Sequence, residues 1–189
     1  MAAGLKVEFR RKRESKTDYA KRITFIKSGI PRIVVRKTLK NIHAQLIEFN
    51  PDGDKVLVSA SSKQLEKLGW KYSRSNLAAS YLVGFMLGKN ASKKGVKNAI
   101  LDIGMNISTK GSKLYALLKG VVDSGIEVPY SEEILPSDER IKGKHIADFA
   151  SSLKKDNKEK YDKVFSSYAK NNVAPEGIAK SIEEIKSKL

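Results

Sequence analysis

The first forty residues of the chain concentrate basic side chains, the groups that are suited to binding a polyanion. Thirteen of these residues are Lys or Arg, whereas only Glu8, Glu14 and Asp18 are acidic. The full chain of 189 residues carries 37 Lys and Arg against 21 Asp and Glu, for a formal net charge of +16. More than half of the excess charge therefore lies in one segment, which favours a nucleic-acid partner over an ordinary solvated charge run.

Cations and one aromatic ring are closely spaced in residues 1–29, which we call the arm. Arg10 to Arg13 can neutralise successive phosphates, and planar guanidinium groups add paired hydrogen bonds that lysine does not make. Tyr19 either stacks on a base or packs the arm onto the core, and both interpretations stay open. The predicted RNA-binding residues of the arm are Arg10, Arg11, Lys12, Arg13, Lys16, Tyr19, Lys21, Arg22 and Lys27.

Two further groups of polar residues lie where rigid elements are expected. Residues 36–41 bring three cations and two hydrogen-bonding side chains to a turn after a strand, a mount rigid enough for selective contacts. Residues 110–113 begin a helix, whose free backbone N–H groups suit a phosphate, although a simple helix cap is the alternative. The predicted RNA-binding residues here and in the strand before the turn are Arg32, Arg36, Lys37, Thr38, Lys40, Asn41, Lys110, Ser112 and Lys113.

Side chains for catalysis or for a resident metal do not combine into a recognisable site. The chain has no cysteine, and His43 and His145 are far apart in the sequence, so a zinc site is not expected. Gly120 to Gly125 has the glycine spacing of a phosphate-binding loop, but Ile126 replaces the lysine that would contact the phosphates. We therefore expect no enzyme, no catalytic residue, no metal ligand and no cofactor.

Hydrophobic periodicity predicts an α/β fold with a mixed sheet. Three units follow from the sequence: the arm, an α/β RNA-binding core at 30–130 and a mostly helical C-terminal extension at 131–189. Ser75 or Asn76 is expected to cap the helix that follows it. The predicted strands are 32–37, 42–49, 56–60, 99–103 and 126–128, and the predicted helices are 77–87, 112–122, 146–153 and 178–189, with one short helical turn after Thr17.

This order of elements resembles the ribonuclease-H-like architecture, a three-layer α/β/α sandwich whose enzymes bind two metal ions with carboxylates at strand ends. A metal-dependent nuclease is therefore one alternative. Arg32, Arg36 and Lys37 argue against it, because they occupy the strand in which an acidic ligand is required, and Asp102 is the sole strand-end carboxylate. A generic basic protein that coats nucleic acid through charge alone is the other alternative.

The chain contains eight specific sequence motifs, which we call blocks. They are residues 13–22 (RESKTDYAKR), 31–46 (PRIVVRKTLKNIHAQL), 69–70, 76–88, 101–104, 111–120 (GSKLYALLKG), 123–129 and 139–147. In this order the blocks resemble the large-subunit ribosomal protein family numbered eighteen in bacteria and archaea and five in eukaryotes. The last two blocks are similar to its archaeal and eukaryotic branch. The resemblance covers roughly residues 5–150, and the tail after about Lys154 matches no such block.

The resemblance implies a structural constituent of the ribosome with a ribonuclease-H-like fold that lacks the catalytic site. Its implied partners are 5S ribosomal RNA, which the family helps to attach to the large subunit in the central protuberance, large-subunit ribosomal RNA and neighbouring large-subunit ribosomal proteins. By position, the arm from Arg10 to Arg22 and the turn residues Arg36, Lys37, Lys40 and Asn41 face RNA.

The composition points to the cytoplasm and away from a membrane. A chain without cysteine suits a reducing compartment. Its longest apolar stretch, near residues 81–87, is far shorter than the roughly 20 residues that a spanning helix needs, and the basic N-terminus lacks the apolar segment of a secretory signal.

Overall fold

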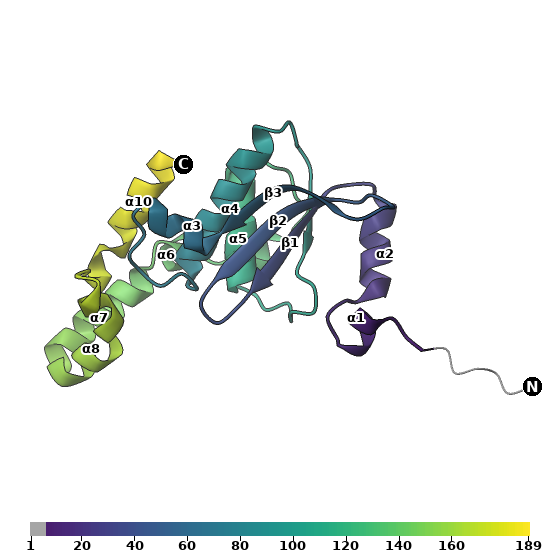
Figure 1. Cartoon of the computed structure of the whole chain (residues 1–189). Coiled ribbons are helices and arrows are strands. Elements are labelled where there is room, and N and C mark those ends of the chain that lie inside the picture. The colour runs from purple at the N-terminus through teal and green to yellow at the C-terminus, as the bar shows by residue number, and fades with distance from the viewer. Residues whose placement is uncertain (1–6) are drawn as a thin grey trace, which may run out of the picture.

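A four-stranded mixed sheet forms the centre of the molecule (Figure 1). The structure is a computed structural model, and it describes residues 7–189. The strands lie in the order β3-β2-β1-β4, with β1 antiparallel to β2 and parallel to β4. Their bounds are Arg32–Lys37 for β1, Ile42–Glu48 for β2, Lys55–Ser61 for β3 and Ile100–Asp102 for β4.

The sheet has an apolar inner face because side chains alternate along each strand. In β1 and β2, Ile33 pairs with Leu46 and Val35 pairs with Ala44, and all four side chains are buried. The alternate residues, among them Arg36 and its partner across the ladder, point to the opposite face. We call that opposite face the outer face of the sheet, and it is the one that carries polar side chains.

Two helices cover the inner face, namely α4 (Leu77–Ser92) and α5 (Lys113–Asp123). Of the two predicted caps, Ser75 and Asn76, it is Asn76 that caps α4, since its side-chain oxygen accepts a hydrogen bond from the Ala79 N–H at 2.7 Å. Both helices extend by one or more residues beyond the predicted ends. They approach closely where glycines face backbone, so Leu82 of α4 and Leu117 of α5 are fully buried between them and the sheet.

The described part of the arm forms two helices, α1 (Arg10–Arg13) and α2 (Tyr19–Lys27). The sequence predicts only one short turn after Thr17, so α2 is longer than expected and α1 is not predicted at all. Asp18 caps α2 by accepting from the N–H groups of Ala20 and Lys21. Figure 1 shows α2 at the edge of the molecule that lies opposite the C-terminal helices. Residues 1–6 of the predicted arm lie outside the described residues.

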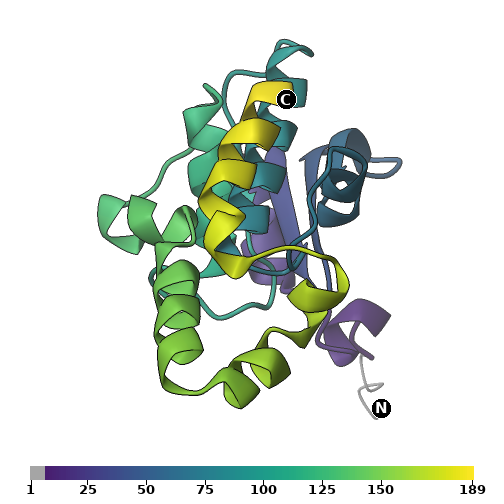
Figure 2. The ribbon, with the colours of Figure 1, turned by 90° about the vertical axis from the view of Figure 1, so that its left-hand side faces the viewer.

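The C-terminal extension is helical, as predicted, and it returns to the core at its end. Its elements are η1 (Glu132–Ile134), α6 (Asp138–Ile141), α7 (Lys144–Asp156), α8 (Lys158–Val164), α9 (Ser166–Lys170), η2 (Pro175–Gly177) and α10 (Ile178–Lys188). Ala150, Leu153 and Phe165 form a small separate cluster. Helix α10 lies along α4 (Figure 2) and contributes Ile178 and Ile182 to the main core.

Hydrogen bonds of Tyr81 link α4 to both α5 and α10. The Tyr81 hydroxyl donates to the Asp123 carboxylate at 2.8 Å and accepts from the Lys186 ammonium at 2.9 Å. Burial, together with the hydrogen bond to Asp123, raises the pKa of Tyr81, so its phenol stays protonated and keeps donating across the neutral range.

The predicted strand at 126–128 is wrong, because only an isolated bridge joins Asn98 to Glu127. Gly125 before it has a left-handed φ of 98°, and Pro129 after it has no N–H for a ladder, so neither end can extend the pairing. Helix α3 (Ser62–Lys67) is a further element that the sequence analysis does not predict. The mixed α/β sandwich itself is confirmed. None of the helices within residues 7–189 has the length and apolar content to cross a bilayer.

Candidate nucleic-acid interface

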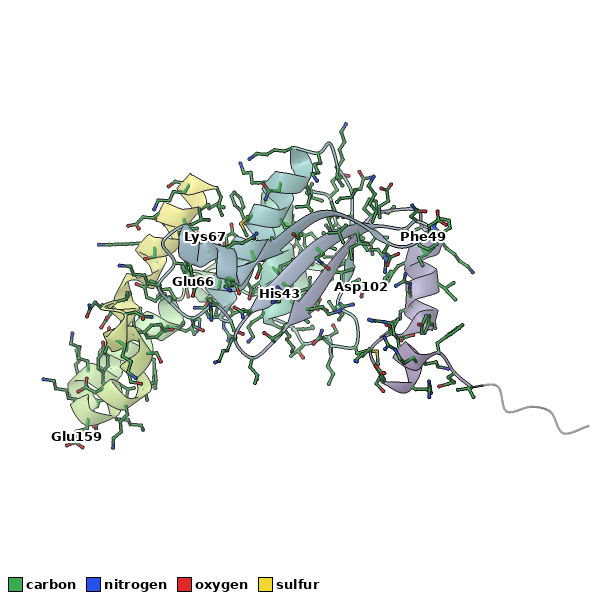
Figure 3. The ribbon with its side chains drawn as sticks, viewed as in Figure 1. His43, Phe49, Glu66, Lys67, Asp102 and Glu159 are labelled. Atoms are coloured by element: carbon green, nitrogen blue, oxygen red, sulfur yellow. The ribbon has the colours of Figure 1, made fainter. Side chains whose placement is uncertain are left out.

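A groove of about 630 Å³ separates the arm from the outer face of the sheet. Both walls are charged, and three carboxylates, Asp18, Asp54 and Asp102, line it as well. In Figure 3, Asp102 lies on the side of the sheet that faces α2, and Phe49 marks the β2–β3 turn beside that helix. The cations that line the groove are Arg11, Lys16, Lys21, Arg22, Arg32 and Arg36. The lining is therefore net positive, which suits a phosphate backbone.

A chain of ion pairs connects the arm to the sheet across this groove. One oxygen of Asp54 accepts from Arg22 of α2 at 2.8 Å and from Arg32 of β1 at 2.9 Å. Arg32 also pairs with Asp102 at 3.5 Å, and its side chain is only 4% exposed. Arg32 is therefore enclosed by two carboxylates and links α2 to the sheet through Asp54, and its contact with RNA stays a prediction.

Arg36, by contrast, reaches the surface at the end of β1. Its side chain is 46% exposed, and one guanidinium nitrogen donates to the carbonyl of Val35 at 2.8 Å. The guanidinium lies over Gly104, where an added Cβ would come within 2.9 Å of it. Gly104 has a left-handed φ of 63°, and this backbone conformation favours glycine at the position. Arg36 is therefore held in place with donors still free to bind a phosphate.

Asp54→Asn should detach the arm and destabilise the protein by about 2 kcal/mol, because it leaves the buried Arg32 with a single carboxylate partner. Urea denaturation checks this. Asp52→Asn is the matched control, since Asp52 lies in the same turn and makes no ion pair among residues 7–189. Equal stability of the two variants would contradict the positioning role of Asp54.

The remaining cations of the arm are exposed to solvent. Arg13 and Lys27 form no ion pair within residues 7–189, and Arg11 donates to the Thr17 hydroxyl at 2.9 Å. The ion pairs inside the arm are Arg10–Glu14 at 3.8 Å, Lys12–Glu8, Lys16–Glu14 at 2.7 Å and Lys21–Asp18 at 3.7 Å. Exposed pairs of this kind contribute about 0 to 1 kcal/mol each, so a phosphate can readily replace the carboxylate.

Tyr19 packs against another ring of the arm and lines a pocket together with Met105 of the core. Its ring is half-buried against Phe9 of the arm, with 5.3 Å between the two ring centroids. The contact stabilises the junction of α1 and α2, and it leaves stacking on a base as a proposal.

The β1–β2 turn presents two lysines on a tightly bonded backbone. The Thr38 N–H donates to the Asn41 carbonyl at 2.8 Å, and the Thr38 hydroxyl accepts from the Asn41 N–H at 3.0 Å. Lys37 and Lys40 are exposed on either side of Thr38 and make no ion pair among the described residues. Thr38 and Asn41 therefore hold the turn, while the two lysines remain available to a ligand.

Residues 110–113, the third predicted group, mostly support the β1–β2 turn and are only partly exposed to solvent. The Lys113 ammonium donates to the Ser75 carbonyl at 2.8 Å and to its hydroxyl at 3.1 Å, and that hydroxyl reaches the Thr38 carbonyl at 3.5 Å. The Ser112 hydroxyl is buried and makes no cap bond to α5. Lys110 forms an exposed pair with Glu133 at 2.8 Å. Of the three, Lys110 is the side chain that can exchange its partner for a phosphate.

Asp54 and Gly104 do not stand out in the sequence, although Asp54 pairs with two arginines and Gly104 lies under the Arg36 guanidinium. The segment Asn50 to Asp54 is recognisable as a turn, but nothing local shows that its last carboxylate meets two arginines. Lys71 and Arg74, in the loop before α4, also escaped notice, although both line a second groove beside the β1–β2 turn.

Comparison with known proteins identifies the family of the chain. A family model described as ribosomal large subunit proteins 60S L5 and 50S L18 matches residues 4–96 and 89–131. A large ribosomal subunit protein uL18 of Korarchaeum cryptofilum is 49% identical over 184 residues, which cover 97% of this chain and 93% of the relative. The chain belongs to this family. A uL18 protein of Caldivirga maquilingensis is 48% identical over 185 residues, covering 97% of this chain and 89% of the relative.

Membership confirms the resemblance found in the sequence and makes the chain a structural, non-enzymatic constituent of the ribosome. It also explains why a sheet with this strand order carries arginines beside Asp102. The nuclease alternative is therefore set aside, because the family is a ribosomal one.

Proposed function

We propose that this protein binds 5S ribosomal RNA and helps to attach it to the cytoplasmic large subunit in the central protuberance, while also contacting large-subunit ribosomal RNA and neighbouring ribosomal proteins. The observation that carries the proposal is the path of presented cations from the arm, through Arg36, to the β1–β2 turn. Family membership supplies the ribosomal setting.

The two ends of this path have different roles in the proposal. The exposed cations of α1 and α2 supply long-range attraction to phosphates, a sequence-independent contribution that falls steeply with salt. Lys37 and Lys40 stand on a turn whose backbone is fixed by Thr38 and Asn41. A rigid mount places charges at a defined spacing, so this turn contributes selectivity among RNA shapes.

The double variant Lys37→Ala, Lys40→Ala tests this division of roles. We expect it to lower the preference for 5S ribosomal RNA over an unrelated duplex of equal length by about tenfold, because it removes shape-specific contacts. Binding to the duplex should change only about two- to threefold.

Filter-binding titrations of both RNAs at physiological salt give the preference for 5S ribosomal RNA and the change in duplex binding. The control is Lys158→Ala, Lys160→Ala, which removes the same charge from exposed positions of α8. If the turn variant loses the same factor on both RNAs, charge alone explains the binding, and the protein behaves as a generic coat.

A further inference from the structure

Leu39, at the tip of the β1–β2 turn, is 99% exposed. Single exposed apolar side chains are common on protein surfaces and need no explanation by themselves. Leu39 differs in its surroundings, because it stands between the two lysines that the proposed function assigns to RNA. An apolar group in that position gains free energy only if the bound partner covers it.

The backbone under Leu39 is fixed before any partner arrives. Three hydrogen bonds close the turn between Thr38 and Asn41, and the Ser75 hydroxyl approaches the Thr38 carbonyl from the loop before α4. Lys113 holds that loop in turn, with its ammonium 2.8 Å from the Ser75 carbonyl. The side chain of Leu39 is thus carried outward on a support that reaches back to α5.

A groove of about 780 Å³ lies directly beside this tip. Leu39 and Lys40 form one wall, and Val164 and Tyr168 of the C-terminal helices line it from the other side. The indole of Trp70 is buried in its floor. The volume falls within the range of small-ligand pockets, which is enough for a nucleotide.

The charge of this groove favours a polyanion over a protein segment of mixed charge. Lys40, Lys71 and Arg74 line it against a single carboxylate, Glu66. Glu66 pairs with Arg74 at 2.8 Å, so its charge is already neutralised. Burial raises the pKa of Tyr168, which keeps this phenol neutral and able to donate a hydrogen bond.

We propose that this groove takes an unpaired nucleotide of the bound RNA, with Leu39 packed against its base and Lys40 and Lys71 bound to the flanking phosphates. The inference rests on the proposed function, and it adds that the turn reads a bulge or loop instead of a continuous duplex. Unpaired bases are what proteins read in RNA, because the deep major groove of the A-form helix excludes side chains.

Leu39→Ala is the decisive variant, because a fully exposed side chain can be shortened without loss of folding. Affinity for a cognate 5S ribosomal RNA transcript should fall about tenfold, the effect of uncovering one leucine. The dependence of log K on log salt should stay unchanged, since no phosphate contact is lost. Lys71→Ala should instead reduce that slope by about 0.7 to 0.9.

Chemical probing locates the contact. Wild-type protein should protect at least one unpaired base of the transcript from dimethyl sulfate, and Leu39→Ala should leave that base reactive while the hydroxyl-radical footprint of the backbone stays in place. Val56→Ala is the control: it shortens another exposed aliphatic residue, on β3 outside the lining of this groove, and should behave as wild type.

The outcomes separate the inference from the function on which it rests. Wild-type affinity and protection in Leu39→Ala would overturn the inference and leave 5S binding intact. If, in addition, the Leu39→Ala protein fails to enter large subunits although it binds the transcript normally, Leu39 contacts a protein and not a base. Failure of the wild-type protein to prefer the transcript would refute the proposed function itself.

Discussion

Replacing Arg10, Arg11, Lys12 and Arg13 together by glutamine is expected to weaken binding to 5S ribosomal RNA about a hundredfold at physiological salt. These side chains are exposed, and the ion pairs of Arg10 and Lys12 lie within the arm at the surface. Each cation that meets a phosphate releases a counterion. The slope of log K against log salt should therefore become shallower by about 3, which is four contacts at roughly 0.7 to 0.9 each.

A variant with the same loss of charge elsewhere distinguishes the effect of the arm's position from the effect of total charge. Replacing four lysines of α7 and α8 by glutamine removes the same charge from exposed positions at the opposite side of the molecule, and we expect less than a threefold effect from it. These residues are Lys154, Lys155, Lys158 and Lys160. Equal losses in the two quadruple variants, measured by filter binding over a salt series, would show that position is irrelevant and contradict the role of the arm.

Gly84→Ala should destabilise the fold by about 3 kcal/mol, at the upper end of what overpacking of a core usually costs. A Cβ at this position of α4 would lie 2.0 Å from the carbonyl oxygen of Leu117 in α5, and one at Gly120 would lie 2.1 Å from that of Tyr81. Backbone atoms cannot move aside as a flexible side chain can, so the two helices must separate. The inner layer that supports the sheet would then loosen.

The sign of this effect makes it a sharp test. In a helix interior, alanine is favoured over glycine by about 1 kcal/mol, so local propensity alone predicts that Gly84→Ala stabilises the protein. Urea denaturation measures the difference. Ser92→Ala, at the exposed end of the same helix, should change stability by less than about 0.5 kcal/mol. A stabilised Gly84→Ala would contradict the close packing of α4 on α5.

Elements with a strong local signal were predictable from the sequence. The β-branched centre of residues 32–37 predicted β1 with the bounds that are observed. The alternation of apolar and polar residues in 42–49 predicted β2 to within one residue. Asn76 marked the start of α4, because its side chain offers the acceptor that the helix terminus needs. These features depend on neighbouring residues, which a linear reading sees directly.

Elements that depend on distant contacts were not predictable. Helices α8 and α9 are short, and they persist because Phe165 between them packs against Ala150 and Leu153 of α7. The predicted strand at 126–128 failed for the converse reason: its apolar residues are buried, but glycine and proline at its ends restrict it to one bridge.

The candidate interface shows the same division. The cations of the interface could be named from the sequence. Whether each of them is free to bind RNA or is already paired with a carboxylate could not be predicted. Arg32 looks as suited to RNA as Arg36 does, yet Asp54 and Asp102, which lie 22 and 70 positions further along the chain, enclose it. Only the folded chain distinguishes an arginine that positions the arm from one that is free to bind.

Selective binding of 5S ribosomal RNA is tested by the affinity of the unmodified protein for that RNA and for an unrelated duplex RNA of equal length, each titrated over a salt series. We predict at least about tenfold preference for 5S ribosomal RNA at physiological salt, with both affinities falling as salt rises. Equal affinity for the two RNAs at physiological salt would contradict it.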